Sequence, residues 1–596
     1  MGLVARLVRE YRFLKDVLRT LGRVKSVDRD STNLICDDLE AAVDRWPERE
    51  ALVFEGRALT FAEFDRMANR FANWARSERI LRGQTVAIVL PNRLEYLAAW
   101  YGLTKIGAVA ALVSNQLTGP TLAHCLKVSG ASHAIVDDET APGLEAARPL
   151  LDRPVRAWTL GKPTAGHVKD LNLALRGASS VRPDRAARDG MTAKDTALYI
   201  FTSGTTGLPK AARMTHMRVQ LYMRGFAGAM DGNETDRVYC ALPLYHATGG
   251  LCAAGSALLN GGCFIVARGF SASNFWPDVI ATRATMFVYI GELCRYLVNQ
   301  PERPEERLHR IRLAFGNGLR PDVWPKLKAR FAIPRIIEFY GATEGNVSMF
   351  NFDGKEGAIA RAPWYLRSRF NIRLIRFDVE AEEPVRGSDG LCIECEPDEV
   401  GECVGEIGTG VRTAYAGYAD KAASEKKILR NVFRKGDAYF ATGDLMRQDE
   451  EGYFYFVDRI GDTFRWKSEN VSTTEVAGVL AQFPGVREAV VYGVPVGDMD
   501  GKAGMAALVV GPEFDIKALA AHVEASLPGY AAPLFVRLQP AAQVTGTFKY
   551  RKIDLVSAGF DPAKVDGPVF YKNPAKGYMR LTRPTFQKIM NGEMRL

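Results

Sequence analysis

Short apolar segments that end in a glycine-bearing loop recur along this chain, and they constrain its fold more than any other feature. Three of them are "ATMFVYIG", "RIRLAFGNG" and "PRIIEFYGATEG". A further segment, "QTVAIVL", is almost wholly apolar, which is typical of a strand covered on both faces of its sheet. Helical segments alternate with strands between about residues 50 and 140. The pattern predicts a layered α/β body, and in open α/β sheets such loops lie where ligands bind.

Local signals near the start of this body agree with the alternation. The stretch "ALVFEGRALT" predicts a β-hairpin with a Glu-Gly turn. Thr60 and Glu63 form a capping box, so a helix is expected to begin after Thr60. The apolar residues of that helix recur at helical spacing and should be buried; they are Phe64, Met67, Phe71 and Ala75.

Length and changes of pattern predict the domain organisation. At 596 residues the chain is too long for one compact core. It is rich in strand and turn signals from about residue 370 to 457, and a shorter mixture of strands and helices follows "DRIGDTF". We predict an α/β protein with a large layered N-terminal body that includes a β-rich subdomain (31–457), a boundary at 458–462, and a smaller α+β C-terminal domain with its tail (463–596).

Composition limits the partners and the cellular setting. The net charge of +9 favours anionic ligands such as nucleotides, carboxylates or an acidic membrane surface. No basic run carries interleaved aromatic residues, so nucleic acid is not expected as a partner. Scattered cysteines and the lack of a secretory signal indicate reduced thiols and a cytoplasmic location. Cys392, Cys395 and Cys403 have metal-like spacing but no fourth Cys or His nearby, which favours ordinary thiols over a zinc site.

Residues 1–30 form a separate basic segment that predicts an amphipathic helix. Its apolar residues recur at helical spacing while basic residues fill the other faces; the apolar set is Leu3, Leu7, Val8, Tyr11, Leu14, Leu18 and Leu21. The helix either packs on its own domain or lies in a membrane interface beside anionic head groups, peripheral on the inner face. No apolar run reaches the length of a bilayer span. The nearest run, which begins at Gly249, predicts a buried helix, a turn and a strand.

The loop in "YIFTSGTTGLPK" carries the clearest chemical signal. A strand leads into hydroxyls and glycines and then into Lys210. Hydroxyls and bare amides donate hydrogen bonds to phosphate oxygens, and glycine lets the main chain approach them. The spacing is not that of a Walker loop, and Ala211 offers no hydroxyl to magnesium, so a P-loop ATPase or kinase is disfavoured. The loop predicts a polyphosphate site formed by Thr202, Ser203, Gly204, Thr205, Thr206 and Gly207.

Seven motifs in order make the chain resemble the adenylate-forming superfamily of acyl-CoA synthetases, luciferases and peptide-synthetase adenylation domains. They are "YIFTSGTTGLPK", "LPLYHATGG", "GNGLRP", "EFYGATEGN", "ATGDL", "FVDRIGDTFRWKSENVSTTEV" and "TGTFKYRK". "YGATEGN", "GDTFRWK" with "NVSTTEV", and the closing "GYMRLTRPTFQKIMNGEMRL" are similar to the branch of fatty-acid transport proteins and very-long-chain acyl-CoA synthetases. The resemblance covers nearly the whole chain from about Ala51.

This resemblance implies an AMP-binding body, a C-terminal lid domain and a hinge at 458–462. It also implies an enzyme that uses ATP, Mg²⁺ and coenzyme A. A fatty acid would first form an acyl-adenylate with release of pyrophosphate, and the coenzyme A thiol would then displace AMP.

The resemblance further implies roles for individual residues. Lys549 would bridge the incoming carboxylate and the α-phosphate, and Glu344 would bind magnesium with Thr202 as a second contact. Asp444 and Arg459 would contact the ribose hydroxyls. The adenine and the α-phosphate would be lined by Tyr340, Gly341, Ala342, Thr343, Gly316 and Asn317. The residues after the lysine, Arg551 and Lys552, are expected to face solvent.

His246, in "LPLYHATGG", leaves two alternatives. It is either a gate of the acyl site beside the phosphates, as an aromatic residue or His is in this family, or a satisfied core histidine. The small residues that follow it could let a helix stand back from a long acyl chain, or could pack tightly; they are Ala247, Gly249, Gly250, Ala253, Ala254 and Gly255.

Two departures from the family pattern concern the second half-reaction. Gly461 stands at the hinge where many relatives have Asp or Lys, and Ser468 replaces the glycine of "WKGEN". Adenylation is therefore more firmly implied than thioester formation. The alternatives are a ligase for a steroid-type or aromatic acid, a ligase that passes its acyl group to a carrier protein, and a lipid-uptake protein in which acyl activation is secondary.

Overall fold

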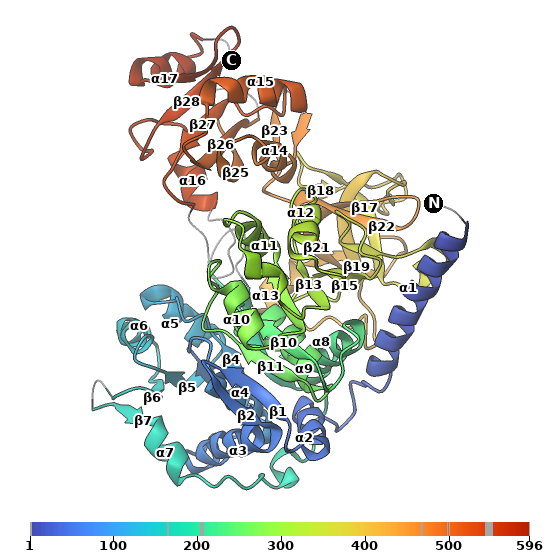
Figure 1. Ribbon diagram of the computed structural model, residues 1–596, viewed down its shortest axis with the longest axis vertical. Helices are drawn as coiled ribbons and strands as arrows, with labels where there is room; N and C mark the ends of the chain where they lie inside the picture. The colour runs from blue at the N-terminus through green and yellow to red at the C-terminus, as the bar shows by residue number, and fades with distance from the viewer. Residues whose placement is uncertain are drawn as a thin grey trace. The chain divides into compact units, whose positions relative to one another are not determined.

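The computed structural model describes residues 3–163, 166–202, 208–466, 469–497, 499, 501–542 and 552–594 (Figure 1). The chain divides into two compact units. Unit 1 comprises Met1–Leu319, Lys326–Glu356 and Glu406–Leu429, and unit 2 comprises Arg320–Pro325, Gly357–Gly405 and Arg430–Leu596. The boundary that we predict at 458–462 begins at the end of a strand inside unit 2, and it stays a prediction.

The larger sheet of unit 1 carries several of the glycine-bearing loops. Its order is β15-β14-β13-β12-β10-β11-β1-β2, with parallel pairing except at the two edge strands. The strands are β1 (Glu50–Phe54), β2 (Arg57–Thr60), β10 (Arg237–Cys240), β11 (Cys263–Val266), β12 (Met286–Ile290), β13 (Leu313–Asn317), β14 (Ile336–Gly341) and β15 (Ser348–Asn351). Because β13 and β14 are adjacent and parallel, Asn317 and Gly341 end them at the same edge.

The second sheet of unit 1 has the order β7-β6-β5-β3-β4-β8-β9, and it is parallel except for β9. Its strands are β3 (Thr85–Ile88), β4 (Val109–Leu112), β5 (Ala131–Val136), β6 (Arg156–Thr159), β7 (Val168–Asp170), β8 (Thr196–Thr202) and β9 (Lys210–Thr215). As predicted from its apolar sequence, β3 is buried throughout.

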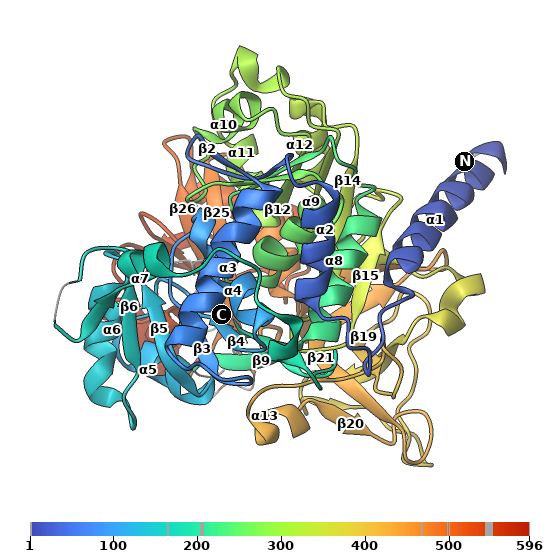
Figure 2. The same ribbon diagram turned by 90° about the horizontal axis from the view of Figure 1, so that it is seen from below.

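Unit 1 also contains a set of helices, most of which lie against the two sheets (Figure 2). They are α1 (Leu3–Val24), α2 (Ile35–Arg45), α3 (Phe61–Ser77), α4 (Leu94–Lys105), α5 (Gly119–Val128), α6 (Ala141–Ala147), α7 (Leu171–Gly177), α8 (His216–Ala229), α9 (Ala254–Leu258), α10 (Phe275–Ala281), α11 (Gly291–Val298), α12 (Trp324–Phe331) and α13 (Lys421–Glu425). A π-helix spans Thr248–Ala253. Short 3-10 helices of unit 1 span Arg148–Leu150, Arg185–Arg188 and Pro304–Arg307, and one in unit 2 spans Trp364–Arg369.

The local predictions for the start of the body are confirmed. Strands β1 and β2 form the hairpin, with Glu55 and Gly56 both at positive φ in the turn. The Thr60 hydroxyl accepts a hydrogen bond from the Glu63 N–H at 3.2 Å, and the Glu63 carboxylate accepts one from the Thr60 N–H at 2.8 Å. Of the apolar residues expected inside, Phe64, Phe71 and Ala75 are buried and Met67 is half-buried.

Unit 2 holds most of the strand-rich region and the C-terminal part. The first sheet there has the order β16-β22-β21-β19-β17-β18, with β20 paired to β21. Its strands are β16 (Ala360–Arg361), β17 (Ile372–Asp378), β18 (Glu383–Pro384), β19 (Val400–Glu406), β20 (Ile428–Arg430), β21 (Ala438–Gln448) and β22 (Tyr453–Arg459).

A hairpin and a mixed sheet complete unit 2. They contain β23 (Phe464–Trp466), β24 (Glu469–Val471), β25 (Val486–Val494), β26 (Ala503–Val510), β27 (Phe535–Leu538), β28 (Val569–Asn573) and β29 (Gly577–Arg580). The helices are α14 (Thr473–Leu480), α15 (Ile516–Ser526), α16 (Lys552–Ala558) and α17 (Arg583–Met590). The predicted fold class, a layered α/β body with a β-rich part and a smaller α+β part, is confirmed.

Helix α1 packs on α8 through its polar side. Arg19 Nε donates a hydrogen bond to the Gly228 carbonyl at 2.6 Å, and a Cβ on Gly228 would lie only 2.9 Å from Thr20 Cα. Phe13 is 1% exposed, and its ring centre lies 6.2 Å from that of Phe352. The opposite side of α1 exposes an apolar stripe, which we define as Val4, Leu7, Val8, Tyr11, Leu14, Leu18 and Leu21. Over the described ranges, no helix combines the length and the hydropathy that crossing a bilayer requires.

Candidate functional site

Strands β8 and β9 hold the two ends of the predicted phosphate loop. Thr202 is the last residue of β8 and lies opposite Lys210, the first residue of β9, in the antiparallel register. The loop residues between them, Ser203, Gly204, Thr205, Thr206 and Gly207, lie outside the described residues, and their roles stay predictions. The strand pairing alone brings the first hydroxyl of the motif beside its lysine.

Tyr418, which sequence reasoning missed, links these strands to the predicted metal ligand Glu344. A β-bridge between Tyr418 and Ala212 attaches its segment to the edge of β9. The Tyr418 hydroxyl donates a hydrogen bond to Glu344 Oε1 at 2.9 Å. The Lys210 ammonium lies 5.6 Å from the centre of the Tyr418 ring. The side chain of Tyr418 thus brings together residues from β9 and from the loop after β14.

The Glu344 carboxylate affects the pKa values of two neighbouring tyrosines, Tyr418 and Tyr415. Burial raises the pKa of Tyr418 well above its ordinary value, Glu344 raises it further, and a hydrogen bond with Thr202 acts in the opposite direction. Burial and then Glu344 raise the pKa of Tyr415 to about 12. Both tyrosines therefore stay neutral near pH 7. Among the described residues Glu344 forms no ion pair with Lys or Arg.

Helix α8 fixes the loop that carries Glu344. The Arg218 guanidinium, in the first turn of α8, donates hydrogen bonds to the carbonyls of Ala342 at 2.8 Å and Thr343 at 3.0 Å. One turn later the Tyr222 hydroxyl donates to the Ala342 carbonyl at 3.2 Å. A cation in the first turn of a helix opposes the macrodipole. That unfavourable placement is a sequence signal by which Arg218 could have been found.

The predicted adenine segment at the end of β13 packs against β12. A Cβ on Gly316 would lie 2.1 Å from the Tyr289 carbonyl oxygen, so close strand packing by itself requires glycine there. The Tyr289 hydroxyl donates a hydrogen bond to Glu338 Oε2 at 2.5 Å, and the Leu319 N–H donates to Oε1 at 2.9 Å. Burial raises the pKa of Glu338 to about 8. This buried acid, also missed from the sequence, anchors the chain two residues after Asn317.

Tyr340 and Gly341 end β14, beside the end of β13. A Cβ on Gly341 would approach the Val347 carbonyl no closer than 3.5 Å, which is an ordinary contact. The position therefore has room that Gly316 lacks. The structure thus brings Gly316, Asn317, Tyr340 and Gly341 to one edge of the sheet, while their roles toward a nucleotide stay predictions.

His246 lies at the start of an unusual helix. It is half-buried, and its ring centre lies 4.5 Å from that of Tyr245. Its carbonyl accepts a hydrogen bond from the Gly250 N–H at 2.8 Å, just as the π-helix begins. π-Helical turns are frequent at functional sites. The geometry is compatible with a gate, and that role stays a prediction.

The glycines after His246 pack against backbone. A Cβ on Gly250 would lie 2.1 Å from the Leu244 carbonyl oxygen, and one on Gly255 would lie 2.5 Å from Met223 Cα. Gly249 is similarly confined, with a Cβ position 2.7 Å from a carbonyl oxygen. For these three residues the structure favours tight packing over space for an acyl chain.

The predicted ribose pair meets within unit 2. Asp444 of β21 lies opposite Arg459 of β22 in the strand register, and Arg459 Nε is 3.4 Å from Asp444 Oδ1. Asp444 is buried, while the Arg459 side chain is 40% exposed. Strand pairing positions both side chains without the help of any loop.

Lys549, Arg551 and Ser468 lie outside the described residues, so their roles stay predictions. The expectation that Lys552 faces solvent is wrong. Its ammonium lies 3.1 Å from Asp462 Oδ2 and donates a hydrogen bond to Thr473 Oγ1 at 2.9 Å, because α16 begins beside the predicted hinge.

The predicted hinge contains a glycine whose backbone conformation favours glycine over other residues. Gly461 has φ +90°, a region in which a side chain is strained, and no atom lies within 4 Å of a Cβ built there. An Asp or Lys side chain would be strained at this φ. Gly461 therefore belongs to a backbone conformation that suits glycine.

The cysteines give no sign of a metal centre. Cys392, Cys395 and Cys403 are free thiols. In the part of the chain that the structure describes, no three or more His, Cys, Asp or Glu side chains are grouped so that they could hold a metal ion. A single carboxylate with oxygen donors from hydroxyls and phosphates, as around Glu344, is a different kind of site.

Comparisons with known proteins establish the family. A family model described as "AMP-binding enzyme" matches residues 39–395, and "AMP-binding enzyme C-terminal domain" matches residues 475–549. The chain is 39% identical over 571 residues to "Long-chain fatty acid transport protein 6" of Mus musculus, covering 94% of this chain and 91% of that protein. It is 40% identical over 567 residues to "Long-chain fatty acid transport protein 1" of Homo sapiens, covering 94% and 87%.

Solved structures agree on the fold. An anthranilate CoA ligase in complex with anthranoyl-AMP superposes with a TM-score of 0.74 at 21% identity, covering 90% of this chain and 98% of that chain. A Mycobacterium tuberculosis fatty acyl CoA synthetase superposes with a TM-score of 0.62 at 24% identity, covering 88% and 98%. Since the first family model spans more than half of the chain and the relatives are matched over most of their length, this chain belongs to the AMP-binding enzymes of the adenylate-forming superfamily, in the branch of the long-chain fatty acid transport proteins.

Proposed function

We propose that this enzyme joins a long-chain or very-long-chain fatty acid to coenzyme A through an acyl-adenylate. The fatty acid carboxylate attacks the α-phosphorus of ATP and pyrophosphate leaves; the coenzyme A thiol then attacks the acyl carbon and AMP leaves. The observation that carries the proposal is the cluster around Tyr418, where Thr202, Lys210 and Glu344 meet. The printed names of the relatives support a fatty acid as the acyl donor.

The residues of this cluster fit Mg²⁺. The Glu344 carboxylate and the Thr202 hydroxyl are oxygen ligands, which this hard cation prefers, and Mg²⁺ keeps part of its shell for water and phosphate. The Tyr418 hydroxyl already occupies one lone pair of Glu344 Oε1, which orients the carboxylate and leaves Oε2 for a ligand. When bound, the ion would neutralise charge on the phosphate oxygens.

We assign the remaining roles by the chemistry of each side chain. Lys210 and the hydroxyls of its loop would hold the phosphates, and Lys549 would stabilise charge as it shifts toward pyrophosphate. Asp444 and Arg459 would bind the ribose hydroxyls. Arg218 acts through the loop backbone and is a positioning residue. His246 would gate the acyl group.

Two half-reaction assays test the adenylation step. Glu344→Gln should lose most magnesium-dependent pyrophosphate exchange and recover little at high Mg²⁺, because the amide lacks the charge of the ligand. Lys549→Ala should keep ATP binding but lose acyl-adenylate formation. Glu356→Gln is a matched control, since Glu356 is exposed and outside the cluster. Wild-type exchange by both site variants would refute the assignment.

The acyl donor and acceptor are tested separately. We would measure thioester formation across a ladder of fatty acids, with coenzyme A and without it, and compare steroid-type and aromatic acids. A long-chain optimum with strict dependence on coenzyme A is expected. Exchange that proceeds with an aromatic or steroid acid instead would favour the alternative ligase, and thioester formation only on a carrier protein would identify a different acceptor.

We also propose that the apolar stripe of α1 lies on a membrane surface with anionic lipids. The stripe is well exposed, with Leu7 at 60%, Tyr11 at 69% and Leu18 at 67%. The net charge of +9 adds electrostatic attraction to an acidic surface. A long-chain fatty acid partitions into the same surface, so this location would bring the enzyme to its substrate.

Point substitutions test the stripe better than a truncation, because removal of α1 would also remove the buried Phe13. Leu7→Gln with Leu18→Gln should weaken vesicle binding about tenfold or more, since each leucine loses roughly 1–2 kcal/mol of burial. Leu173→Gln is the control, because Leu173 is 63% exposed on another helix. Equal binding by the stripe variant and wild type would refute the proposal, and activity on a soluble medium-chain acid should not change.

A further inference from the structure

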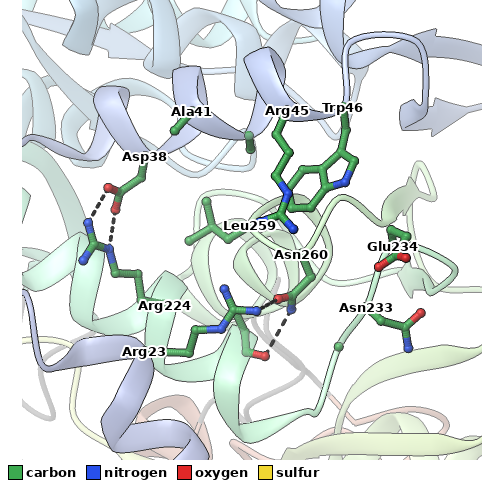
Figure 3. A pocket seen from close by; sticks show the side chains of 13 residues that line it. Arg23, Asp38, Ala41, Arg45, Trp46, Arg224, Asn233, Glu234, Leu259 and Asn260 are labelled. Atoms are coloured by element: carbon green, nitrogen blue, oxygen red, sulfur yellow. Dashed lines mark hydrogen bonds and ion pairs between the residues drawn. The ribbon is translucent and has the colours of Figure 1, made fainter.

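A cavity of about 390 Å³ lies in unit 1 on the side of α2 and α8 (Figure 3). The C-terminal ends of α1, α2 and α8 surround it, together with the segments that precede β10 and β11. Three arginines reach it from three different helices: Arg23 from α1, Arg45 from α2 and Arg224 from α8. Trp46 and Asn260 also line the cavity.

The three guanidinium groups are not equally neutralised. Arg224 pairs with Asp38 through two contacts, from Nε at 2.7 Å and from the terminal nitrogen at 2.5 Å. Arg23 donates to the neutral Asn260 side chain, and the Arg45 guanidinium lies 4.6 Å from the centre of the Trp46 ring. Among the described residues neither Arg23 nor Arg45 forms an ion pair with a carboxylate. Two cations therefore face the cavity without an ion-paired carboxylate, and Glu234 is the further acidic residue in its lining.

The mutual repulsion of these cations acts on Arg23. Partial burial lowers its pKa, and the charges of Arg45 and Arg224 lower it further. A basic residue in the last turn of a helix offsets the macrodipole, which accounts for Arg23 in α1 and Arg45 in α2, whereas Arg224 precedes the last turn of α8. The macrodipole does not account for their convergence on one cavity, where each guanidinium raises the cost of the others unless an anion lies between them.

The cavity is not part of the nucleotide site. Gly232, Asn233 and Glu234 precede β10, and Leu259 and Asn260 precede β11, so the cavity lies at the N-terminal edge of these strands. Asn317 and Gly341 end β13 and β14, and β10–β14 are parallel. The adenine segment and the metal loop therefore lie at the opposite edge of the same sheet.

We propose that Arg23 and Arg45 bind a phosphate group in this cavity, either the headgroup phosphate of an anionic phospholipid or that of a soluble phosphate ester. Guanidinium forks bind phosphate through paired hydrogen bonds, and Arg224 is held beside them by Asp38. Arg23 lies in the last turn of α1 on the side that packs on α8, opposite the exposed stripe, so the two sources are distinguished by experiment. The proposal does not depend on the ligase reaction.

The test uses the full chain, a double variant and two matched controls. Arg23→Gln with Arg45→Gln replaces both guanidinium groups by neutral amides. Arg57→Gln with Arg176→Gln removes the same charge from exposed arginines that do not line the cavity. Arg23→Lys with Arg45→Lys keeps both positive charges but loses the paired N–H donors of each guanidinium group. Should the Arg23 change lower the thermal midpoint, Arg45→Gln alone is informative, because Arg45 is exposed.

Binding is measured with inorganic phosphate, with glycerol 3-phosphate, and with phosphatidylcholine vesicles with and without phosphatidylglycerol. The double Gln variant should bind at least one phosphate probe about tenfold more weakly than wild type, the Lys variant should be weakened as well, and the Arg57/Arg176 control should not change. Loss confined to phosphatidylglycerol vesicles identifies a lipid source, and loss with glycerol 3-phosphate identifies a soluble ester. The proposal is overturned if wild type binds none of the probes, if the Lys variant binds as wild type does, or if the control loses as much affinity as the double variant.

Discussion

Glu338 is expected to make the stability of unit 1 depend on pH. Its side chain is buried between Tyr289 and the Leu319 amide, and burial raises its pKa from 4.5 to about 8. The folded chain therefore holds this proton more tightly than the unfolded chain does. The stability conferred by the proton is complete below about pH 4.5 and is lost as the pH rises through 8. Glu338→Gln should mimic the protonated acid, with its oxygen accepting from Leu319.

The magnitude follows from the two pKa values. Between pH 6 and pH 9 a carboxyl with a folded pKa near 8 and an ordinary unfolded pKa loses roughly 3 kcal/mol of stabilisation. For a unit of several hundred residues this corresponds to a fall of the thermal midpoint by roughly 3–5 °C. The glutamine variant should lack this contribution, because it does not titrate.

Thermal midpoints of wild type and of Glu338→Gln at pH 6 and pH 9 test the argument. The pH-induced fall should be smaller in the variant by the amount given above, and other titrating groups cancel in the comparison. Glu356→Gln serves as control, because Glu356 is an exposed acid and its removal should leave the wild-type fall unchanged. An equal fall in wild type and in Glu338→Gln would show that Glu338 is ionised in the folded protein at pH 6 and that the reasoning is wrong.

Three further predictions concern packing, the hinge and the second half-reaction. Gly255→Ala should destabilise by about 2 kcal/mol or more, because its Cβ would lie 2.5 Å from Met223 Cα, whereas Gly22→Ala, with open space, should not destabilise; urea midpoints compare the two. Lys552→Gln and Asp462→Asn should each lower the thermal midpoint slightly, and the double variant should be no worse than either one, as a double-mutant cycle will show. Ser468→Gly should not alter pyrophosphate exchange and should raise or preserve thioester formation; a fall in both would refute the division between the steps.

Sequence reasoning succeeded where a local pattern decides the structure. The capping box at Thr60 and the apolar strand β3 depend on residues close in sequence, and both formed as predicted. Asp444 and Arg459 meet through the register of two strands that are neighbours in sequence, while the roles predicted for them stay predictions. These features need no knowledge of how distant segments meet.

The residues that were missed depend on distant segments. Tyr418 reaches Glu344 across 74 positions of sequence, and a single tyrosine in a turn-rich stretch carries no signal of its own. Glu338 is a single polar residue within an otherwise apolar strand, and only its burial beside Tyr289 gives it a raised pKa. Neither the periodicity of apolar residues nor the spacing of motifs indicates which distant residues will be in contact.

Helix α1 shows why an amphipathic pattern does not decide which face is packed. Burial of the apolar stripe against the body would be the ordinary outcome. Here α8 ends in carbonyls that need donors, and Arg19 supplies them to Gly228 at 2.6 Å and to Ala229 at 3.3 Å. Gly228 lets the backbone of α1 approach closely at Thr20, so the polar side gains hydrogen bonds that the apolar side cannot form. The leucines are then left at the surface, where an exposed apolar stripe of this length is typical of an interaction site.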